Sequence, residues 1–228
     1  MKIAFYAPLK SPHHAVPSGD RQMARSLMVA LERAGHGVML ASELRAFLPD
    51  PDDGAALAAL RVAAAGERDR IAALWSVQGA PDLWFCYHPY YKSPDLIGPD
   101  LARRFDLPWV SAEASLSARR TQGIWQETQA AVVAAIDAAA LNFGMTARDR
   151  AGLHAFLPGA RISPLAPFIA AEPLPPPASL TGSRLVTVAM MRSGDKIDSY
   201  HALAAALARL PGHIDWRLAV AGDGPCRA

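Results

Sequence analysis

Cysteine is scarce in this sequence: its 228 residues contain two, Cys86 and Cys226, which lie far apart along the chain. Two isolated cysteines form no cysteine-based zinc pattern. Cys86 lies in an apolar run that resembles a strand, which favours a buried free thiol and a reducing compartment.

Long apolar runs are also missing, since no run approaches the roughly 20 apolar residues that cross a bilayer. The N-terminus has one lysine, Lys2, and a short apolar run before Pro8, which predicts neither a signal peptide nor a spanning segment. We therefore expect a cytoplasmic protein. Charged residues make up 19% and the net charge is +2, too little to predict a nucleic-acid partner. Hydrophobic residues reach 51%, so the 228 residues can bury one large core or two modest ones.

The start of the chain has the pattern of a β-α-β unit. Lys2–Tyr6 is a short apolar run that predicts a buried strand. Ser18 is a good N-cap for a helix that ends at Gly35, and Asp20 in its first turn suits the helix dipole. His36–Ala41 predicts the next strand.

Strands and helices continue to alternate. Further strands are expected over Leu83–Tyr87, Pro108–Ala112, Ala140–Met145 and Arg161–Ser163, and helices over Ala55–Ala65, Glu67–Val77, a stretch starting near Pro99, Trp125–Ala139 and Ala147–Phe156. Gly66 separates the first two of these helices, and Thr146 caps the last. The alternation predicts an α/β domain with a doubly wound parallel sheet over residues 1–169.

A change of composition divides the chain. Residues 170–183 are rich in proline and predict a stiff, extended linker. Residues 184–228 then predict a strand at Leu185–Met190, a helix at Ser199–Leu210 and a strand at Trp216–Ala221. That is one βαβ unit, which is too small for a full doubly wound domain.

Candidate ligand-binding residues follow three of the predicted strands, at the edge where parallel α/β sheets bind ligands. Gly19 ends the loop after the first strand, and a helix N-terminus there can bind a phosphate or a hydroxyl; plain capping is the alternative. The loop lacks the glycines of a dinucleotide fingerprint, which disfavours a dehydrogenase. His88 and Glu113 follow the next two strands of this edge. A carboxylate there can orient a hydroxyl or act as a base, whereas capping of Ser115–Ser117 is the simpler role.

Three stretches of the sequence carry a resemblance to a known family. They are Val188–Lys196 (VAMMRSGDK), Val220–Pro225 (VAGDGP) and Ser18–Arg21 (SGDR). They are similar, in that order, to the V-G-R-x-x-x-x-K-G stretch, the G-x-G-P turn and the first glycine loop of the family 4 (group 1) retaining glycosyltransferases, which have the GT-B fold. Met191 replaces the usual glycine before the arginine, and no glycine follows Lys196. The resemblance implies an N-terminal acceptor domain, the linker, and the beginning of a second Rossmann-like domain for the donor.

The resemblance implies transfer of a sugar from a UDP- or GDP-linked donor, with retention and without a metal or other cofactor. Arg192 and Lys196 would bind the donor diphosphate, because cations stabilise the charge that develops on this leaving group. Gly19 would let backbone amides approach the same diphosphate. Ser18, Arg21 and His14 are candidates for further substrate contacts.

The acceptor would bind to the loops of the N-terminal domain. His88 resembles the histidine of the family's H-x-x-E-P region, although Tyr91 and Lys92 replace its acid and proline. His88 and Glu113 are the catalytic candidates, and Tyr90, Tyr91 or Trp109 could stack on a sugar. The acceptor itself, a glycan, a lipid or a small molecule, is not predicted. Arginine pairs at 103–104 and 119–120 could make a weak peripheral membrane contact, and a solvated face is the alternative.

The family's E-x7-E motif lies beyond the G-x-G-P turn and does not occur before Ala228, so we expect the donor domain to be incomplete. Two alternatives follow. The chain could be a non-catalytic nucleotide or sugar-binding module, or half of a two-chain enzyme. It could also resemble a GT-B epimerase that alters the nucleotide sugar itself.

Overall fold

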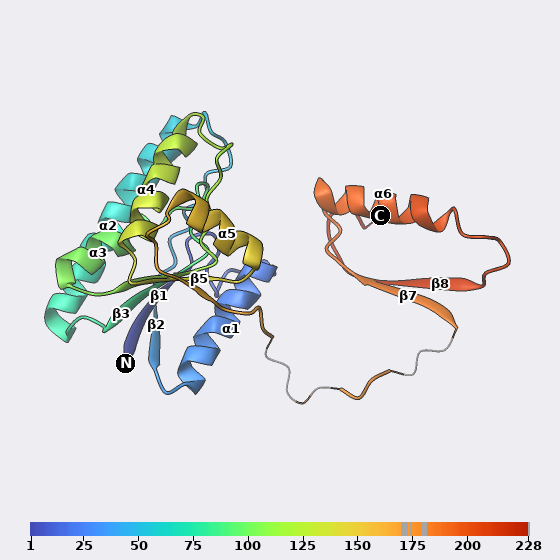
Figure 1. Ribbon diagram of the computed structural model, residues 1–228, viewed down its shortest axis with the longest axis horizontal. Coiled ribbons are helices and arrows are strands. Elements are labelled where there is room, and N and C mark those ends of the chain that lie inside the picture. The colour runs from blue at the N-terminus through green and yellow to red at the C-terminus, as the bar shows by residue number, and fades with distance from the viewer. Residues whose placement is uncertain (170–172, 174, 179–181, 228) are drawn as a thin grey trace. The chain divides into compact units, whose positions relative to one another are not determined.

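The computed structural model describes residues 1–169, 173, 175–178 and 182–227. The chain divides into two compact units, an N-terminal unit, Met1–Ala170, and a C-terminal unit, Ala171–Ala228 (Figure 1). Of the predicted linker, residues 170–172, 174 and 179–181 lie outside the described residues.

The N-terminal unit is built on a parallel sheet of six strands in the order β2-β1-β3-β4-β5-β6. The strands are β1 (Lys2–Tyr6), β2 (Gly37–Ser42), β3 (Leu83–Tyr87), β4 (Trp109–Ala112), β5 (Leu141–Gly144) and β6 (Ile162–Pro164). Every neighbouring pair is parallel, which confirms the predicted sheet. The reversal of strand order beside β1 is the point at which open α/β sheets bind their ligands.

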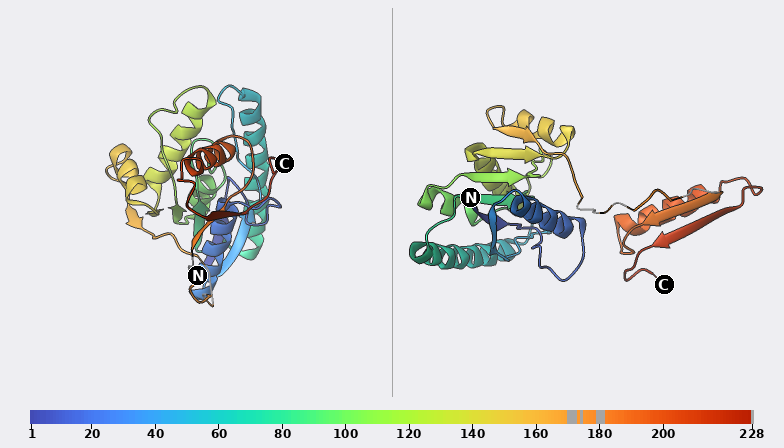
Figure 2. Two further views of the ribbon diagram at one scale, coloured as in Figure 1. Left: turned by 90° about the vertical axis from the view of Figure 1, so that its right-hand side faces the viewer. Right: turned by 90° about the horizontal axis from the view of Figure 1, so that it is seen from below.

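Helices cover both faces of this sheet. They are α1 (Gly19–Arg33), α2 (Gly54–Gln78), α3 (Gly98–Phe105), α4 (Ile124–Ala138) and α5 (Ala147–Phe156). One face packs against α2, α3 and α4, and the other packs against α1 (Figures 1 and 2). The unit is therefore a Rossmann-like α/β fold.

Apolar strand residues form the two halves of the core. Register pairs Phe5 of β1 with Phe85 of β3, and their rings stack at 5.5 Å on the α1 face. On the opposite face, Trp84 packs edge-on against Tyr6 and against Trp75 of α2. These inward-facing aromatics hold the central strands in register.

Helix α2 is continuous where the sequence predicted two helices separated at Gly66, so that prediction is wrong. Leu60, Ala64, Ile71 and Trp75 lie buried along one side of α2 on both sides of the glycine. A glycine in a helix costs about 1 kcal/mol relative to alanine. Burial of this apolar side outweighs that cost.

The C-terminal unit contains two parallel strands, β7 (Ser183–Val188) and β8 (Trp216–Ala221), joined by α6 (Asp195–Leu207). The predicted helix began at Ser199, but α6 already begins at Asp195, where acidic residues in the first turn suit the helix dipole. Val186 and Val188 of β7 are 70% and 79% exposed. Among the described residues of both units, no helix is long and apolar enough to cross a membrane.

Candidate functional site

The first component of the site is the N-terminus of α1, which follows the loop after β1. The hydroxyl of Ser18 accepts a hydrogen bond from the amide of Arg21 at 3.2 Å, which confirms the predicted N-cap. Gly19 opens the helix, and a Cβ placed on it would meet no atom within 4 Å. The N-terminus of α1 therefore has open space beside Gly19 within the described chain, in which a small group could lie.

The Arg21 guanidinium shapes the loop that precedes the helix. Its Nη1 donates to the carbonyls of His14 at 2.8 Å and Ala15 at 3.1 Å. Within the part of the chain that the structure describes, its buried Nε has no partner. His14 accepts from the amide of Val16 through Nδ1 at 3.0 Å. Arg21 and His14 thus order the loop, and their contacts with a substrate stay predictions.

His88 lies one residue beyond β3 and contacts α1. Its Nδ1 is 3.0 Å from Oδ1 of Asp20, 68 residues away in the sequence. This hydrogen bond is the main reason why the pKa of Asp20 lies below its ordinary value, so the carboxyl is ionised at neutral pH. A carboxylate can only accept, so Nδ1 carries the proton and a neutral His88 has Nε2 as its acceptor.

Glu113 occupies the matching position one residue beyond β4. Its Oε2 accepts the hydroxyl of Tyr87 at 2.7 Å. Burial, followed by the Glu113 charge, raises the pKa of Tyr87 far above its ordinary value, so the phenol keeps its proton and remains the donor. Glu113 itself is only half-buried, and its carboxylate can therefore still receive a hydrogen bond from a ligand.

The backbone turns sharply at both strand ends. His88 has φ +58° and Glu113 has φ +59°, a left-handed conformation that residues other than glycine rarely adopt. The His88 amide donates to the Ala112 carbonyl at 2.8 Å, and the Glu113 amide donates to the Phe143 carbonyl at 2.9 Å. Each turn is thereby attached to the neighbouring strand. Such costly conformations concentrate at functional sites, where the surrounding structure holds them in place.

A row of rings leads away from His88. Tyr90 stacks on His88 at 5.2 Å, Tyr91 meets Tyr90 at 5.4 Å, and Trp125 meets Tyr91 at 5.1 Å. Burial raises the pKa of Tyr90 to about 12, which keeps this phenol protonated. Trp109, also predicted to stack on a sugar, lies in the core instead and is 5% exposed. The half-buried Tyr90 and Tyr91 remain candidates for contact with a ring-shaped ligand.

Sequence reasoning missed three members of this cluster. Asp20 was recognised only for the helix dipole, whereas the structure also makes it the partner of His88. Tyr87 was placed only in a strand, and Trp125 only in a helix. Asp20 had the clearest signal, since a carboxylate beside a loop glycine would lie near the ends of the neighbouring strands.

In the C-terminal unit, the two stretches that carry the resemblance contact each other. The Met191 amide donates to the Asp223 carbonyl at 2.9 Å, and the Met191 carbonyl accepts the Cys226 amide at 3.0 Å. A Cβ on Gly222 would lie 1.9 Å from the Ala189 carbonyl oxygen, and one on Gly224 would lie 2.1 Å from that of Met191. The backbones of the two stretches can therefore approach this closely only because residues 222 and 224 are glycine.

Arg192 directly follows Met191, and Lys196 lies in the first turn of α6. Both side chains are exposed, and neither forms an ion pair with any residue in the described ranges. They lie beyond the carboxyl ends of β7 and β8, and both cations are available to an anion. Across the described residues, no group of three or more His, Cys, Asp or Glu side chains could hold a metal ion.

Comparison with protein-family models and with curated proteins finds no match for this chain. The fold and the site define a Rossmann-like α/β domain with a polar cluster at the carboxyl edge of its sheet, followed by a smaller β-α-β unit. A function for this arrangement has to come from the chemistry of the two sites.

Proposed function

We propose that this chain is a glycosyltransferase of the GT-B type, which transfers a sugar from a UDP- or GDP-linked donor to an acceptor hydroxyl. The observation that carries the proposal is the pairing of His88 with Asp20, beside Glu113, at the ends of adjacent strands. These groups suit a hydroxyl-bearing substrate, because they combine the second ring nitrogen of His88 with the partly exposed carboxylate of Glu113.

His88 is the residue that receives the acceptor hydroxyl. Asp20 fixes the ring through Nδ1, and Nε2 can then accept the hydrogen of an alcohol. Glu113, held by Tyr87, can accept from a second hydroxyl of the same sugar or acceptor. The half-buried Tyr90 and Tyr91 extend this surface with rings that can pack on the apolar face of a sugar.

Arg192 and Lys196 bind the diphosphate of the donor. Cleavage of the anomeric C–O bond leaves negative charge on the diphosphate, and cations at this position stabilise the transition state more than the ground state. The guanidinium can bind two phosphate oxygens, whereas the ammonium acts as a point charge. The contact between Met191 and the Gly222–Pro225 turn supports this role, since it orders the backbone next to Arg192.

Transfer proceeds with retention at the front face of the sugar. The bond from the anomeric carbon to the diphosphate oxygen breaks, a bond to the acceptor oxygen forms on the same face, and the acceptor proton passes to the departing diphosphate. His88 Nε2 orients the acceptor hydroxyl in the bound state, and the hydroxyl hydrogen turns from Nε2 to the departing diphosphate oxygen as the anomeric bond breaks. The route needs neither a metal nor an enzymic nucleophile.

The test is product analysis with the full 228-residue chain, a panel of UDP- and GDP-sugars, and a mixture of sugar, lipid and small alcohol acceptors. Release of nucleotide that depends on acceptor, lost in His88→Ala and kept in His154→Ala, supports transfer. Formation of a new nucleotide sugar without acceptor would assign an epimerase instead. Saturable donor binding without turnover would assign a binding module or half of a two-chain enzyme.

A further inference from the structure

Helix α6 carries a tyrosine whose hydroxyl is bonded to the end of the neighbouring strand. The Oη of Tyr200 donates to the carbonyl oxygen of Ala189 at 3.0 Å, and Ala189 is the first residue after β7. The amide of Ala189 in turn donates to the carbonyl of Ala221, the last residue of β8, at 3.2 Å. One hydroxyl therefore joins α6 to the ends of both strands, along which the helix lies (Figure 1).

Gly222 leaves room for this hydrogen bond. A Cβ on Gly222 would lie 1.9 Å from the Ala189 carbonyl oxygen and 3.5 Å from the Oη of Tyr200. The backbone that follows β8 therefore passes directly beside the donor and the acceptor. The hydroxyl of Tyr200 lies where this turn, the end of β7 and α6 come together.

The same hydrogen bond connects the two cations that are assigned to the donor diphosphate. Lys196 lies one helical turn before Tyr200, so the two residues share a side of α6. Arg192 lies three residues after Ala189, on the strand side of the bond. Tyr200 therefore ties the backbone that carries Lys196 to the backbone that carries Arg192.

The distance between Arg192 and Lys196 depends on where α6 lies. The segment between them contains Gly194 at φ +80°, and glycine allows the chain to turn there in several ways. No residue of α6, a helix that the structure describes throughout, is buried, and a hollow of about 570 Å³ lies between side chains of α6 and β8. Apolar packing therefore holds α6 loosely, and the directed hydrogen bond of Tyr200 fixes its first turns.

Net charge does not select a ligand at this place. Asp195 and Asp198 lie in the same first turn as Lys196, so the charges between residues 192 and 198 sum to zero. An anion that reaches one cation alone gains little, whereas an anion that spans both gains two charge-assisted contacts. A diphosphate offers one phosphoryl group to each cation, and orthophosphate does not.

We propose that Tyr200 is a positioning residue that makes this site select a diphosphate over a monophosphate. Its hydroxyl holds Arg192 and Lys196 at a separation at which each cation meets one phosphoryl group. The inference rests on the proposed function only through the assignment of these two cations to a diphosphate. Inorganic ligands can therefore test it without a sugar or a nucleotide.

The test compares sodium pyrophosphate with sodium orthophosphate on the ¹⁵N-labelled full chain, at one pH and ionic strength and without divalent cations. Shifts of amide resonances give the two dissociation constants. The wild-type protein should bind pyrophosphate at least tenfold more tightly than orthophosphate, and Tyr200→Phe should lower this ratio at least fivefold. Because the charge of each ligand is the same for every variant, a change in the ratio reports the placement of the cations.

A second hydroxyl of α6 provides the matched control. The Oγ of Ser199 donates at 2.6 Å to the carbonyl of Asp195 in the same helix, so Ser199→Ala removes a hydroxyl without loosening α6 from β7. The ratio of affinities should be unchanged in Ser199→Ala. Absence of pyrophosphate binding, or the same ratio in Tyr200→Phe and the wild-type protein, would overturn the proposal.

A double variant separates positioning from a purely structural role. In an Arg192→Ala background only one cation remains, so Tyr200→Phe should change the affinity for pyrophosphate less than twofold there. An equal fold-loss in both backgrounds would assign Tyr200 to the stability of the unit and would overturn its positioning role.

A second pair of variants leaves Tyr200 in place and gives the answer if Tyr200→Phe does not fold. Arg192→Ala and Lys196→Ala together should weaken pyrophosphate binding less than the product of their separate fold-losses, because removal of either cation already ends the spanning contact. Losses that multiply would show that the two cations act independently, which would overturn the proposal.

The outcomes distinguish this inference from the proposed function. Pyrophosphate binding with the expected ratios, but without binding of UDP or GDP, would support the role of Tyr200 and refute glycosyl transfer. Binding of UDP or GDP that depends on Arg192, with an unchanged ratio in Tyr200→Phe, would refute the role of Tyr200 alone.

Discussion

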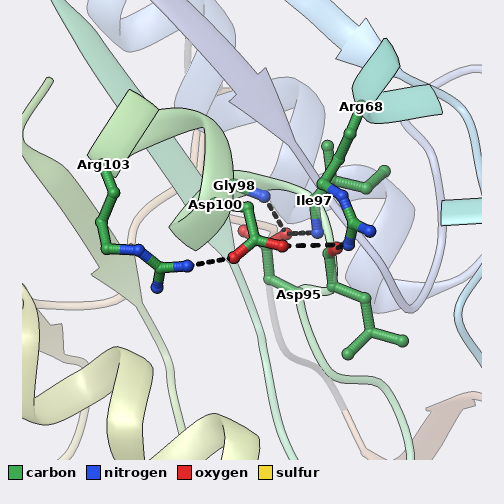
Figure 3. Close-up of polar contacts among 7 residues, drawn as sticks. Arg68, Asp95, Ile97, Gly98, Asp100 and Arg103 are labelled. Atoms are coloured by element: carbon green, nitrogen blue, oxygen red, sulfur yellow. Dashed lines mark hydrogen bonds and ion pairs between the residues drawn. The ribbon is translucent and has the colours of Figure 1, made fainter. Parts of the chain in front are cut away.

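Replacement of Asp95 by asparagine should destabilise the N-terminal unit strongly. Asp95 is 6% exposed, and its Oδ1 accepts the amides of Ile97 at 3.0 Å and Gly98 at 2.7 Å (Figure 3). Its Oδ2 accepts the indole N–H groups of Trp84 at 2.8 Å and Trp109 at 3.0 Å. One carboxylate therefore joins the loop before α3 to the side chains of β3 and β4.

The size of the effect follows from the donors that lose their acceptor. Asparagine keeps one oxygen and places an NH₂ group where the other oxygen was, so two buried N–H groups face a donor. Each unpaired buried donor costs about 1–3 kcal/mol, which gives about 2–6 kcal/mol for the pair. Burial raises the pKa of Asp95, and relief from burying this charge offsets part of the loss, so we expect about 3 kcal/mol.

Urea unfolding followed by tryptophan fluorescence measures this change. Four of the five tryptophans lie in the N-terminal unit, and Trp216 alone lies in the C-terminal unit, so the signal reports mainly on the affected unit. Asp69→Asn removes an exposed carboxylate from α2 and is the matched control. If Asp95→Asn unfolds within 0.5 kcal/mol of the wild-type protein, on the order of an ordinary surface change, the reasoning about this carboxylate is refuted.

Two further predictions concern the site itself. The hydrogen bond from His88 lowers the pKa of the Asp20 carboxyl below its ordinary value of 3.8. The stability that the ionised carboxyl contributes is therefore fully present above pH 3.8 and is lost as the pH falls through the lowered pKa. The free energy of unfolding of Asp20→Asn should therefore fall less than that of the wild-type protein when the pH is lowered below 3.8. If the two proteins show the same dependence of this free energy on pH, the pairing of Asp20 with His88 is contradicted. Gly224→Ala should disrupt the turn beside Arg192, because Gly224 has φ +154° and a new Cβ would lie 2.1 Å from the Met191 carbonyl oxygen. Amide exchange of β8 should accelerate in that variant but not in Gly212→Ala, where a Cβ meets nothing within 4 Å; equal exchange in the two variants would refute it.

The sequence predicted the order of the strands and helices in the N-terminal unit well, because buried parallel strands and amphipathic helices leave strong local patterns. Ser18 and Thr146 were recognised as caps because capping is a local interaction. The prediction that α2 is interrupted at Gly66 was wrong, because the burial that keeps this helix continuous depends on residues far away in the sequence.

The site was only partly predictable for the same reason. The positions of His88 and Glu113 directly after predicted strands indicate that both lie at one edge of the sheet. Their partners were not predicted, because Asp20 lies 68 residues from His88 and Tyr87 lies 26 residues from Glu113. The left-handed backbone of His88 and Glu113 could not be predicted either, because this conformation is usual for glycine and asparagine and neither residue type stands at these positions.

Calorimetric titration of the full chain with UDP and with GDP tests the central proposal most directly. We expect saturable binding of one of the two nucleotides, and Arg192→Ala should weaken it by about tenfold to hundredfold, since a hydrogen bond to a charged group contributes about 1.5–3 kcal/mol. Arg209→Ala, which removes an exposed arginine just beyond the end of α6, should leave the affinity unchanged. Binding of neither nucleotide, or equal affinities in the wild-type protein and Arg192→Ala, would contradict the assignment of this chain to nucleotide-sugar chemistry.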